Sequence, residues 1–409
     1  MFPILCPRCG NSLPIANILQ DRQSGKARGR CQRCKIWVPI SLPSIQKKLI
    51  YLDQSFLSAA CLRAGKSNSE TEVRILAKLQ TLKAQQKIVL VVSDVHSRET
   101  SAIPDQFVDN REKLWKFQND LADGRIAVDW EEVFIAQQRR LLTANGGDDA
   151  FPPSDIGLDN PHLFHIGMHV QLTNSWRQRL DREYATPRSD VNEALRKIIE
   201  KQLASMSSCT GMKDCLEHVL QLWREDIRQG IVAWQKQQDL CARIEQIVEE
   251  LEAGRASNIP AVNLSSPFRR VVGNVAEGLD EYDALQLWLE MLSSSSTGLG
   301  MCAKIRIALE AALLWRWHTA SPPSNPTTFN KGFGLSRQND INHISTYAPY
   351  VDALTTDDDM RSLCAAEVVA EELRQFPCKV FSKSNYDEFE TWLDVLLVEP
   401  LELEREVER

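Results

Sequence analysis

The sequence lacks the features of membrane and secreted proteins. No apolar run approaches the ~18 uninterrupted residues that a membrane-spanning helix needs. The first ten residues, MFPILCPRCG, contain no basic region followed by a long apolar core, so we expect no secretory signal. Seven of the eleven cysteines are scattered singly along the chain, which is typical of reduced thiols. These absences predict a cytoplasmic protein that does not associate with membranes.

Several catalytic signatures are also missing. We find no glycine-rich loop that could cradle phosphates, and no Ser-His-Asp or Cys-His order of the kind that nucleophilic catalysis requires. The net charge of −7 argues against nonspecific binding of polyanions by the whole surface, although it leaves room for a local basic patch. The chain has 409 residues, 43% of them hydrophobic and 25% charged, as expected for a globular protein of two or three domains.

Two close cysteine pairs are present near the N-terminus. The segments CPRCG and CQRCK place Cys6, Cys9, Cys31 and Cys34 in two Cys-x-x-Cys turns. Two such turns joined by a hairpin can surround one zinc ion with four thiolates, and a closed site of this kind is structural. A redox dithiol or a pair of disulfides is the alternative.

The N-terminal unit is basic although the chain as a whole is acidic. Residues 1–40 carry seven Arg and Lys residues and one acid, a net charge of +6. We expect the side chains of Arg28, Arg30, Arg33 and Lys35 to contact nucleic acid, because phosphate contacts need local positive charge. The alternative is a charged surface that keeps a small domain soluble. Trp37 could stack on a base, but we interpret it as a packing residue.

The remaining chain alternates between strand and helix patterns at both ends of a long helical region. Short β-branched runs such as KIVLVVS indicate buried parallel strands, and helical spacing follows them. The predicted class is α/β, with a parallel sheet of about four strands flanked by helices. The predicted units are a zinc ribbon (1–42), a first α/β part (48–110), an all-α insert (111–335), a second α/β part (336–398) and a charged tail (399–409).

Four separate acids are predicted to meet at one edge of this sheet. Asp53 follows the first strand, Asp357 follows the third, Glu99 lies on an early helix, and Asp340 opens a helix that precedes a strand. Ligands gather at the carboxyl ends of parallel strands. Carboxylates held close together repel one another unless a cation neutralises them, and oxygen ligands suit Mg²⁺ or Mn²⁺. Taken singly, Asp53 and Asp340 are equally well interpreted as helix N-caps, and Glu99 as a surface residue.

Neighbouring residues leave the exact set open. Asp358 is the runner-up to Asp357, because three aspartates are adjacent in TTDDDM. Asp352 lies within the preceding strand and could support the metal ligands. His96 lies about one helical turn before Glu99, where it either faces the site or has a structural role.

The ordered segments IYLDQSFLS, KIVLVVSDVHSRET, RQNDINHISTYAPYVDALTTDDDMRSL and CKVFSKSNYDEFETWL resemble a PIN-domain (PIN-like) ribonuclease. The resemblance implies that Asp53, Glu99, Asp340 and Asp357 bind Mg²⁺ or Mn²⁺ and that the protein cuts RNA as an endonuclease. It covers about 120 residues in two blocks. The 240 residues between Glu99 and Asp340 depart from it, since a minimal PIN domain carries no such insert.

These observations predict a metal-dependent nuclease whose partner is nucleic acid, most simply RNA. Toxin-like or defence roles follow from the resemblance alone. The helical insert could shape substrate access, mediate homo-oligomerisation or contact a partner protein. The rivals are a nonenzymatic nucleic-acid-binding or scaffold protein with a degenerate PIN fold, and a DNA-directed nuclease or phosphatase that uses the same carboxylates.

Overall fold

The computed structural model describes residues 5–14, 18–20, 27–40, 45–62, 70–143, 151–158, 161–162, 188–230, 287–288, 290–291, 299–320, 329 and 332–400. Much of the predicted insert, including 163–187 and 231–286, and the tail 401–409 lie outside these residues. None of the helices in the described ranges combines the length and the apolar character that a membrane crossing requires.

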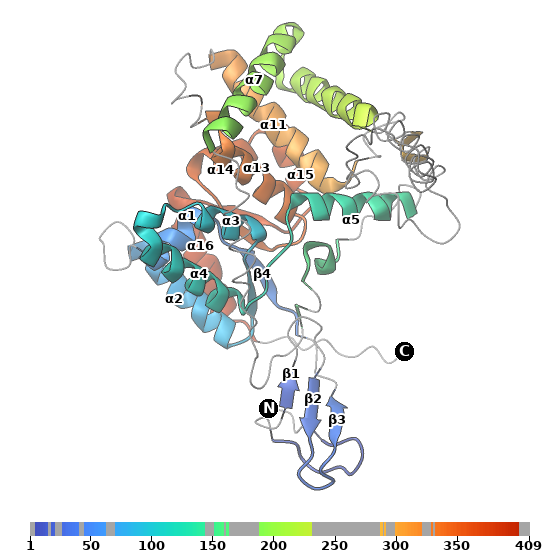
Figure 1. The fold of residues 1–409 in the computed structure, drawn as a ribbon, viewed down its shortest axis with the longest axis vertical. Coiled ribbons are helices and arrows are strands. Elements are labelled where there is room, and N and C mark those ends of the chain that lie inside the picture. The colour runs from blue at the N-terminus through green and yellow to red at the C-terminus, as the bar shows by residue number, and fades with distance from the viewer. Residues whose placement is uncertain are drawn as a thin grey trace, which may run out of the picture.

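A small antiparallel sheet forms the N-terminal unit (Figure 1). Its strands are β1 (Ile18–Gln20), β2 (Ala27–Arg30) and β3 (Trp37–Ile40), and β2 is the central one. Cys6, Cys31, Leu13 and Val38 form its interior. So small a core is poor in apolar side chains, and units of this size usually need a metal or disulfides for stability.

The second sheet has four parallel strands in the order β5-β4-β6-β7, in agreement with the predicted α/β class. These are β4 (Lys48–Tyr51), β5 (Ile88–Val91), β6 (Ala353–Thr355) and β7 (Lys379–Phe381). β4 thus pairs with β5 on one side and, on the other, with β6, which comes some 300 residues later in the chain; Ile50, for example, pairs with Ala353.

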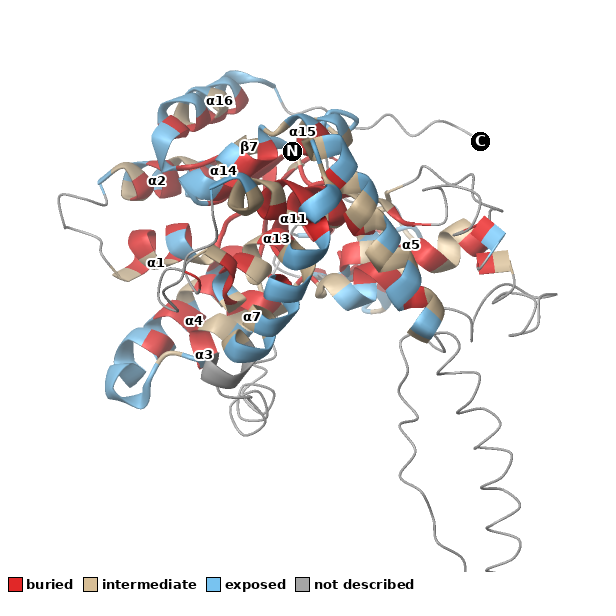
Figure 2. Ribbon diagram, turned by 90° about the horizontal axis from the view of Figure 1, so that it is seen from above, coloured by how far each residue is buried: buried red, intermediate tan, exposed pale blue. Residues whose placement is uncertain are grey.

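Each face of this sheet is covered by helices, and the side chains of the strands alternate between the two faces. Ile50, Leu90 and Phe381 contribute to one core, together with buried residues of four helices. These helices are α1 (Gln54–Leu62), α2 (Glu70–Ala84), α4 (Val108–Ala122) and α16 (Tyr386–Val398). Figure 2 shows that buried residues gather between the layers, whereas exposed ones lie on outer helix surfaces.

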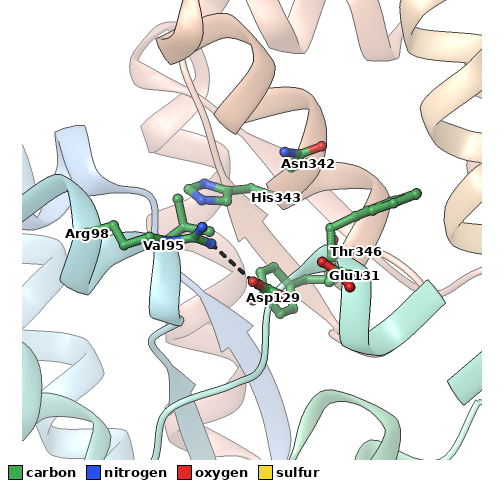
Figure 3. Close-up of a pocket in the computed structure, with 9 residues that line it drawn as sticks. Val95, Arg98, Asp129, Glu131, Asn342, His343 and Thr346 are labelled. Carbon is green, nitrogen blue, oxygen red and sulfur yellow. Dashed lines mark hydrogen bonds and ion pairs between the residues drawn. The ribbon is translucent and has the colours of Figure 1, made fainter. Parts of the chain in front are cut away.

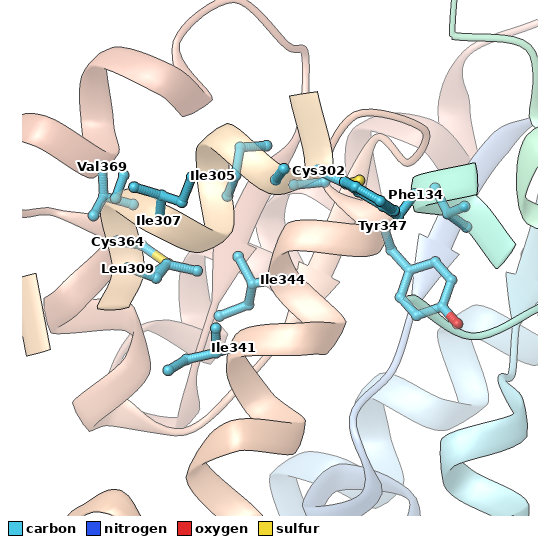
Figure 4. Close-up of a cluster of buried hydrophobic side chains, with 14 of the residues drawn as sticks. Phe134, Cys302, Ile305, Ile307, Leu309, Ile341, Ile344, Tyr347, Cys364 and Val369 are labelled. Atoms are coloured by element: carbon cyan, nitrogen blue, oxygen red, sulfur yellow. The ribbon is translucent and has the colours of Figure 1, made fainter. Parts of the chain in front are cut away.

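The opposite face is a larger core to which Leu49, Tyr51 and Leu354 belong. Its helices are α5 (Trp130–Thr143), α11 (Met301–Ala320), α13 (Leu335–Tyr347), α14 (Asp358–Cys364) and α15 (Glu367–Leu373), and α7 (Arg188–Ser205) contacts α11 and α13. In Figure 4, Ile305 and Leu309 of α11 lie beside Ile341 and Ile344 of α13. Of the predicted insert, α4, α5 and α11 therefore contribute to the two cores that cover the sheet, and its boundary at 110/111 falls inside α4.

The direction of the chain reverses at β4. The chain leaves β4 toward β5 on one side, and later returns to β6 on the other side of β4. In open α/β sheets this reversal marks the place where ligands bind. Asp53 follows β4 and Asp357 follows β6, so both acids lie at the carboxyl edge of the sheet beside the reversal.

Candidate functional site: a thiolate centre and a carboxylate cluster

The four predicted zinc ligands lie together. The sulfur of Cys6 is 3.8 Å from that of Cys34, and the sulfur of Cys9 is 3.6 Å from that of Cys31 and 3.9 Å from that of Cys34. All four sulfurs lie within 4.8 Å of one another. A tetrahedron with metal–sulfur bonds of about 2.3 Å has edges of about 3.8 Å, whereas a disulfide is only about 2.05 Å long. The cysteines are free and can bind a metal such as zinc.

The two turns that carry these cysteines share one backbone geometry. Gly10 follows the second cysteine of the first turn, Lys35 follows that of the second, and both have a left-handed φ, of 67° and 59°. Backbone N–H groups in the second turn, that of Cys34 above all, lower the pKa of the Cys31 thiol to about 6. Burial raises the pKa of Cys34, the other thiol of this turn, to about 11. Since the thiolate is the form that binds metal, Cys31 is the ligand of this turn that is deprotonated most readily.

One face of the small sheet exposes an aromatic ring among cations. Arg28, Arg30, Arg33 and Lys35 are all exposed, as contact with nucleic acid would require. Trp37 is 50% exposed and pairs with Arg30 across β2 and β3, so our interpretation of it as a packing residue is wrong. The period-two alternation of the strand turns Val38 inward and Trp37 outward, which a short sequence with two apolar neighbours could not reveal.

Asp53 is buried where β4 ends and α1 begins. Its carboxylate accepts hydrogen bonds from the backbone N–H groups of Ser55 (3.3 Å) and Phe56 (3.2 Å), so it caps α1. It also accepts from the hydroxyl groups of Ser55 (2.5 Å) and Thr355 (2.9 Å). Burial raises the pKa of Asp53 in spite of these bonds. The side chain is fixed by β4 on one side and β6 on the other.

Glu99 and Asp340 come from two adjacent helices, α3 (Asp94–Ser101) and α13. The side-chain amide of Asn339 donates to Oε1 of Glu99 at 2.8 Å and so joins the two helices. The pKa of Asp340 is raised well above its ordinary value, chiefly by burial and further by the charges of Asp357, Asp53 and Glu99. The charges of the three other predicted acids thus all act on Asp340.

Asp357 caps α14, and Arg337 binds it from α13. The carboxylate of Asp357 accepts from the backbone N–H of Met360 at 2.7 Å. The guanidinium of Arg337 donates to both carboxylate oxygens of Asp357 at 3.2 Å and to Asp359 at 3.2 Å. It also lies 3.6 Å from Asp340, and only 7% of its side chain is exposed. Arg337 thus neutralises part of the cluster's negative charge.

The remaining candidates lie elsewhere or have structural roles. Asp358 accepts a hydrogen bond from the backbone N–H of Ser384 at 3.0 Å, and its pKa is lowered by hydrogen bonds from Ser382 and Ser384. Asp352 lies at the amino end of β6, where it binds the ammonium of Lys48 (2.8 Å) and the N–H of Leu49 (2.9 Å). That is the opposite end of the sheet from the cluster, because a residue before a parallel strand cannot reach its carboxyl edge.

His96 holds the backbone beneath the site. Its Nδ1 accepts from the N–H of Ser93 at 2.9 Å, so Nε2 donates to the carbonyl oxygen of Leu52 at 2.8 Å. Burial lowers its pKa to about 4, which keeps the ring neutral. The structural role that the sequence left open for His96 is therefore the one observed, and it positions the residue just before Asp53.

Arg337, Asn339 and Thr355 were missed by the sequence analysis. The sequence analysis placed Asp340 at the opening of a helix, whereas α13 begins at Leu335 after Gly334, so Arg337 belongs to its first turn. The signal was present, since Arg337 precedes Asp340 by three residues and such pairs share a helix face. Thr355 gave no signal, because β6 alone brings it to Asp53.

The carboxylates are less tightly grouped than the sulfurs. Within the described residues, the four cysteines are the only set of three or more acidic, histidine or cysteine ligands whose atoms lie within 4.8 Å of one another. The carboxylates are oxygen ligands with like charges, which a cation would stabilise. Comparison of the chain with protein-family models, with curated proteins and with solved structures finds no match.

Proposed function

We propose that this protein is a metal-dependent nuclease with a PIN-like α/β unit, and that RNA is its substrate. The observation that carries the proposal is that Asp53, Glu99 and Asp357 all act electrostatically on Asp340, although the four acids come from separate segments of the chain. Asp53 and Asp357 follow β4 and β6, which are neighbours in the sheet. Buried acids with raised pKa values are uncommon outside functional sites, because they cost stability.

The donor set fits a hard divalent cation. Mg²⁺ and Mn²⁺ prefer carboxylate oxygens and keep several water ligands, so the acids need not form a closed cage. Asp53, Glu99, Asp340 and Asp357 would hold the ion. Bound there, it would supply a nucleophilic hydroxide and stabilise charge on a phosphoryl group. The raised pKa of Asp340 supports this assignment, because a cation would offset both its main cause, the burial of the carboxylate, and the added repulsion from the neighbouring acids.

The protein's own residues orient this set. Thr355 and Ser55 fix the carboxylate of Asp53, Asn339 fixes that of Glu99, and Arg337 holds that of Asp357. Arg337 also provides the positive charge nearest the acids, where a phosphate would otherwise be repelled. The thiolate centre would hold a structural zinc, and the exposed face with Arg28, Arg30 and Trp37 would bind the nucleic acid backbone and stack on a base.

Cleavage of labelled RNA by the full chain with Mn²⁺ tests the proposal. The Asp53→Asn variant and the wild type in EDTA should both lose at least ~100-fold in rate, since a metal ligand set supplies several kcal/mol of transition-state stabilisation. Asp358→Asn is the matched control, because Asp358 is adjacent to Asp357 but binds Ser384. Equal cleavage by wild type and Asp53→Asn would refute the proposal. Single-stranded DNA and a small phosphoester, offered in parallel, would reveal a DNA-directed nuclease or a phosphatase.

The second candidate is a nonenzymatic RNA-binding or scaffold protein. It is favoured by Arg337, which already binds the carboxylate of Asp357. In that case the wild type and Asp53→Asn would bind RNA equally, and neither would cut it at any Mn²⁺ concentration.

A further inference from the structure

A cavity of about 150 Å³ opens beside the carboxylate cluster, between α3, α13 and the start of α5. Figure 3 shows Val95 and Arg98 on one side of it and His343 and Thr346 on the other, with Asp129 and Glu131 below. The cluster and the cavity share both helices, since Glu99 follows Arg98 and Asp340 precedes His343 by three residues. A rise of 1.5 Å per residue places His343 about 4.5 Å along α13 from Asp340.

Four lining residues carry buried polar atoms that have no hydrogen-bond partner within the described part of the chain. They are the Nε1 of Trp130, the Oδ1 of Asn342, the Nε2 of His343 and the Oγ1 of Thr346. His343 is 5% exposed and Thr346 is 1% exposed. A buried polar atom without a partner costs about 1–3 kcal/mol, so four around one cavity indicate that something else supplies the partners.

The cavity suits a planar ring. Three aromatic residues, Trp130, His343 and Tyr347, line it. Tyr347 stacks on Tyr51 at 4.4 Å and His343 stacks on His96 at 5.5 Å, so these two rings are fixed. A cavity of about 150 Å³ accommodates a six-membered ring. Polar atoms in such a lining favour a heteroaromatic ring with donors and acceptors over a hydrocarbon.

Arg98 supplies a positive charge at the opening of the cavity, where it can bind an anionic group attached to the ring. The side chain of Arg98 is 53% exposed, and its guanidinium lies 3.3 Å from the carboxylate of Asp129. An exposed ion pair of this kind contributes little, about 0–1 kcal/mol, so the guanidinium can turn to a phosphate at small cost. A ring site with an arginine at its mouth matches a nucleotide.

We propose that this cavity binds one unstacked nucleobase of single-stranded RNA, with Arg98 on its phosphate. Recognition of a splayed base by aromatic rings and polar edges is how proteins read single-stranded RNA. The position of this base next to the cut rests on the proposed nuclease function, whereas binding of the nucleotide does not.

Binding of the four nucleoside 5′-monophosphates to the full chain, measured by calorimetry in EDTA, tests the site. One of them should bind with a Kd below about 1 mM. Thr346→Val removes one hydroxyl at constant shape and should weaken binding of that monophosphate about tenfold. Arg98→Gln should weaken binding of the nucleotide but not binding of the corresponding nucleoside. Ser345→Ala is the matched control, because Ser345 is buried on the same helix but bonds to the carbonyl of Asn342 and does not line the cavity.

The outcomes separate the two proposals. If no monophosphate binds at about 10 mM, or if Thr346→Val and Ser345→Ala bind alike, the cavity holds only water and the nucleobase site is refuted. If a nucleotide binds but no RNA is cut, the site stands and the nuclease proposal fails. If RNA is cut, Thr346→Val should relax base preference at one position beside the cut, while the rate on the best substrate stays within a few-fold of wild type.

Discussion

Replacement of Arg337 by methionine removes a buried guanidinium from among three carboxylates and keeps an apolar side chain in its place. Arg337 lies 3.2 Å from Asp357 and Asp359 and 3.6 Å from Asp340, and its side chain is 7% exposed. The acids are more accessible, with side chains 28%, 46% and 72% exposed for Asp340, Asp357 and Asp359. We therefore expect Arg337→Met to destabilise the fold through uncompensated negative charge.

The exposure of the partners sets the size of this effect. Loss of one partner from a fully buried ion pair costs about 3–5 kcal/mol, whereas exposed pairs contribute about 0–1 kcal/mol. A buried cation that binds half-exposed acids lies between these limits, so we expect a loss of about 2 kcal/mol in the free energy of unfolding. Guanidinium chloride denaturation measures it, with Arg196→Met as control. Arg196 also pairs with two acids, Glu193 and Glu200, but on an exposed helix face, and its loss should be clearly smaller.

A double-mutant cycle with Asp340→Asn identifies the cause. If the cost arises from unbalanced carboxylates, Asp340→Asn should recover about 1 kcal/mol in the Arg337→Met background. Mg²⁺ should also stabilise Arg337→Met more than wild type, because the ion replaces the lost charge. A loss below about 0.5 kcal/mol, or one that Asp340→Asn leaves unchanged, would refute the coupled cluster.

Four further predictions follow from the same contacts. Asp340→Asn should be more stable than wild type at neutral pH and equal to it in acid, by denaturation at a series of pH values; the folded state holds the Asp340 proton at pH values above its ordinary pKa, so the contribution of Asp340 to stability falls as pH rises through that window. The contribution of His96 has the opposite sign and should fall by up to about 3 kcal/mol as pH drops from about 6.5 to about 4, because unfolded His96 takes up a proton that the folded state refuses; the difference in stability between wild type and His96→Gln should change by this amount over the window, and a constant difference would contradict it. Metal analysis should find one zinc per chain, lost in Cys34→Ser and retained in Cys61→Ser, whose cysteine lies outside the thiolate centre. Trp37→Ala should weaken RNA binding about tenfold at all salt concentrations, whereas Arg30→Ala should reduce the number of counterions released on RNA binding by about one, as measured from the salt dependence of the affinity. If neither substitution changes RNA binding, the exposed face of the small sheet is excluded as the RNA contact.

The thiolate centre is the feature that could be read most fully from the sequence. Two Cys-x-x-Cys turns identify their own ligands, because each turn is local and the choice of partner is limited to the other turn. The parallel strands of the second sheet were also predictable, since short β-branched runs such as IVLV are buried on both faces. Burial of both faces follows from the alternation of Ile50 and Tyr51 between two cores.

The carboxylate cluster was predictable in part. The positions of Asp53 and Asp357 after strands were enough to place them at one edge, because parallel strands end on the same side. Which of the three adjacent acids joins the cluster could not be predicted, since Asp357, Asp358 and Asp359 are equivalent in sequence. Only the hydrogen bonds to Ser384 and Arg337 distinguish Asp358 from its neighbours.

Sequence alone therefore determined the residues whose geometry is local: the cysteine turns, the strands and the acids that follow them. The tertiary structure decided what depends on contacts between distant segments: the strand order β5-β4-β6-β7, the bond from Thr355 to Asp53, the guanidinium of Arg337 among the acids, and the cavity between α3 and α13. The physical reason is the separation in sequence between the residues that determine each feature. A turn or a strand is specified by neighbours in the chain, whereas the charge around Asp340 depends in part on residues more than 200 positions away, such as Glu99 and Asp53.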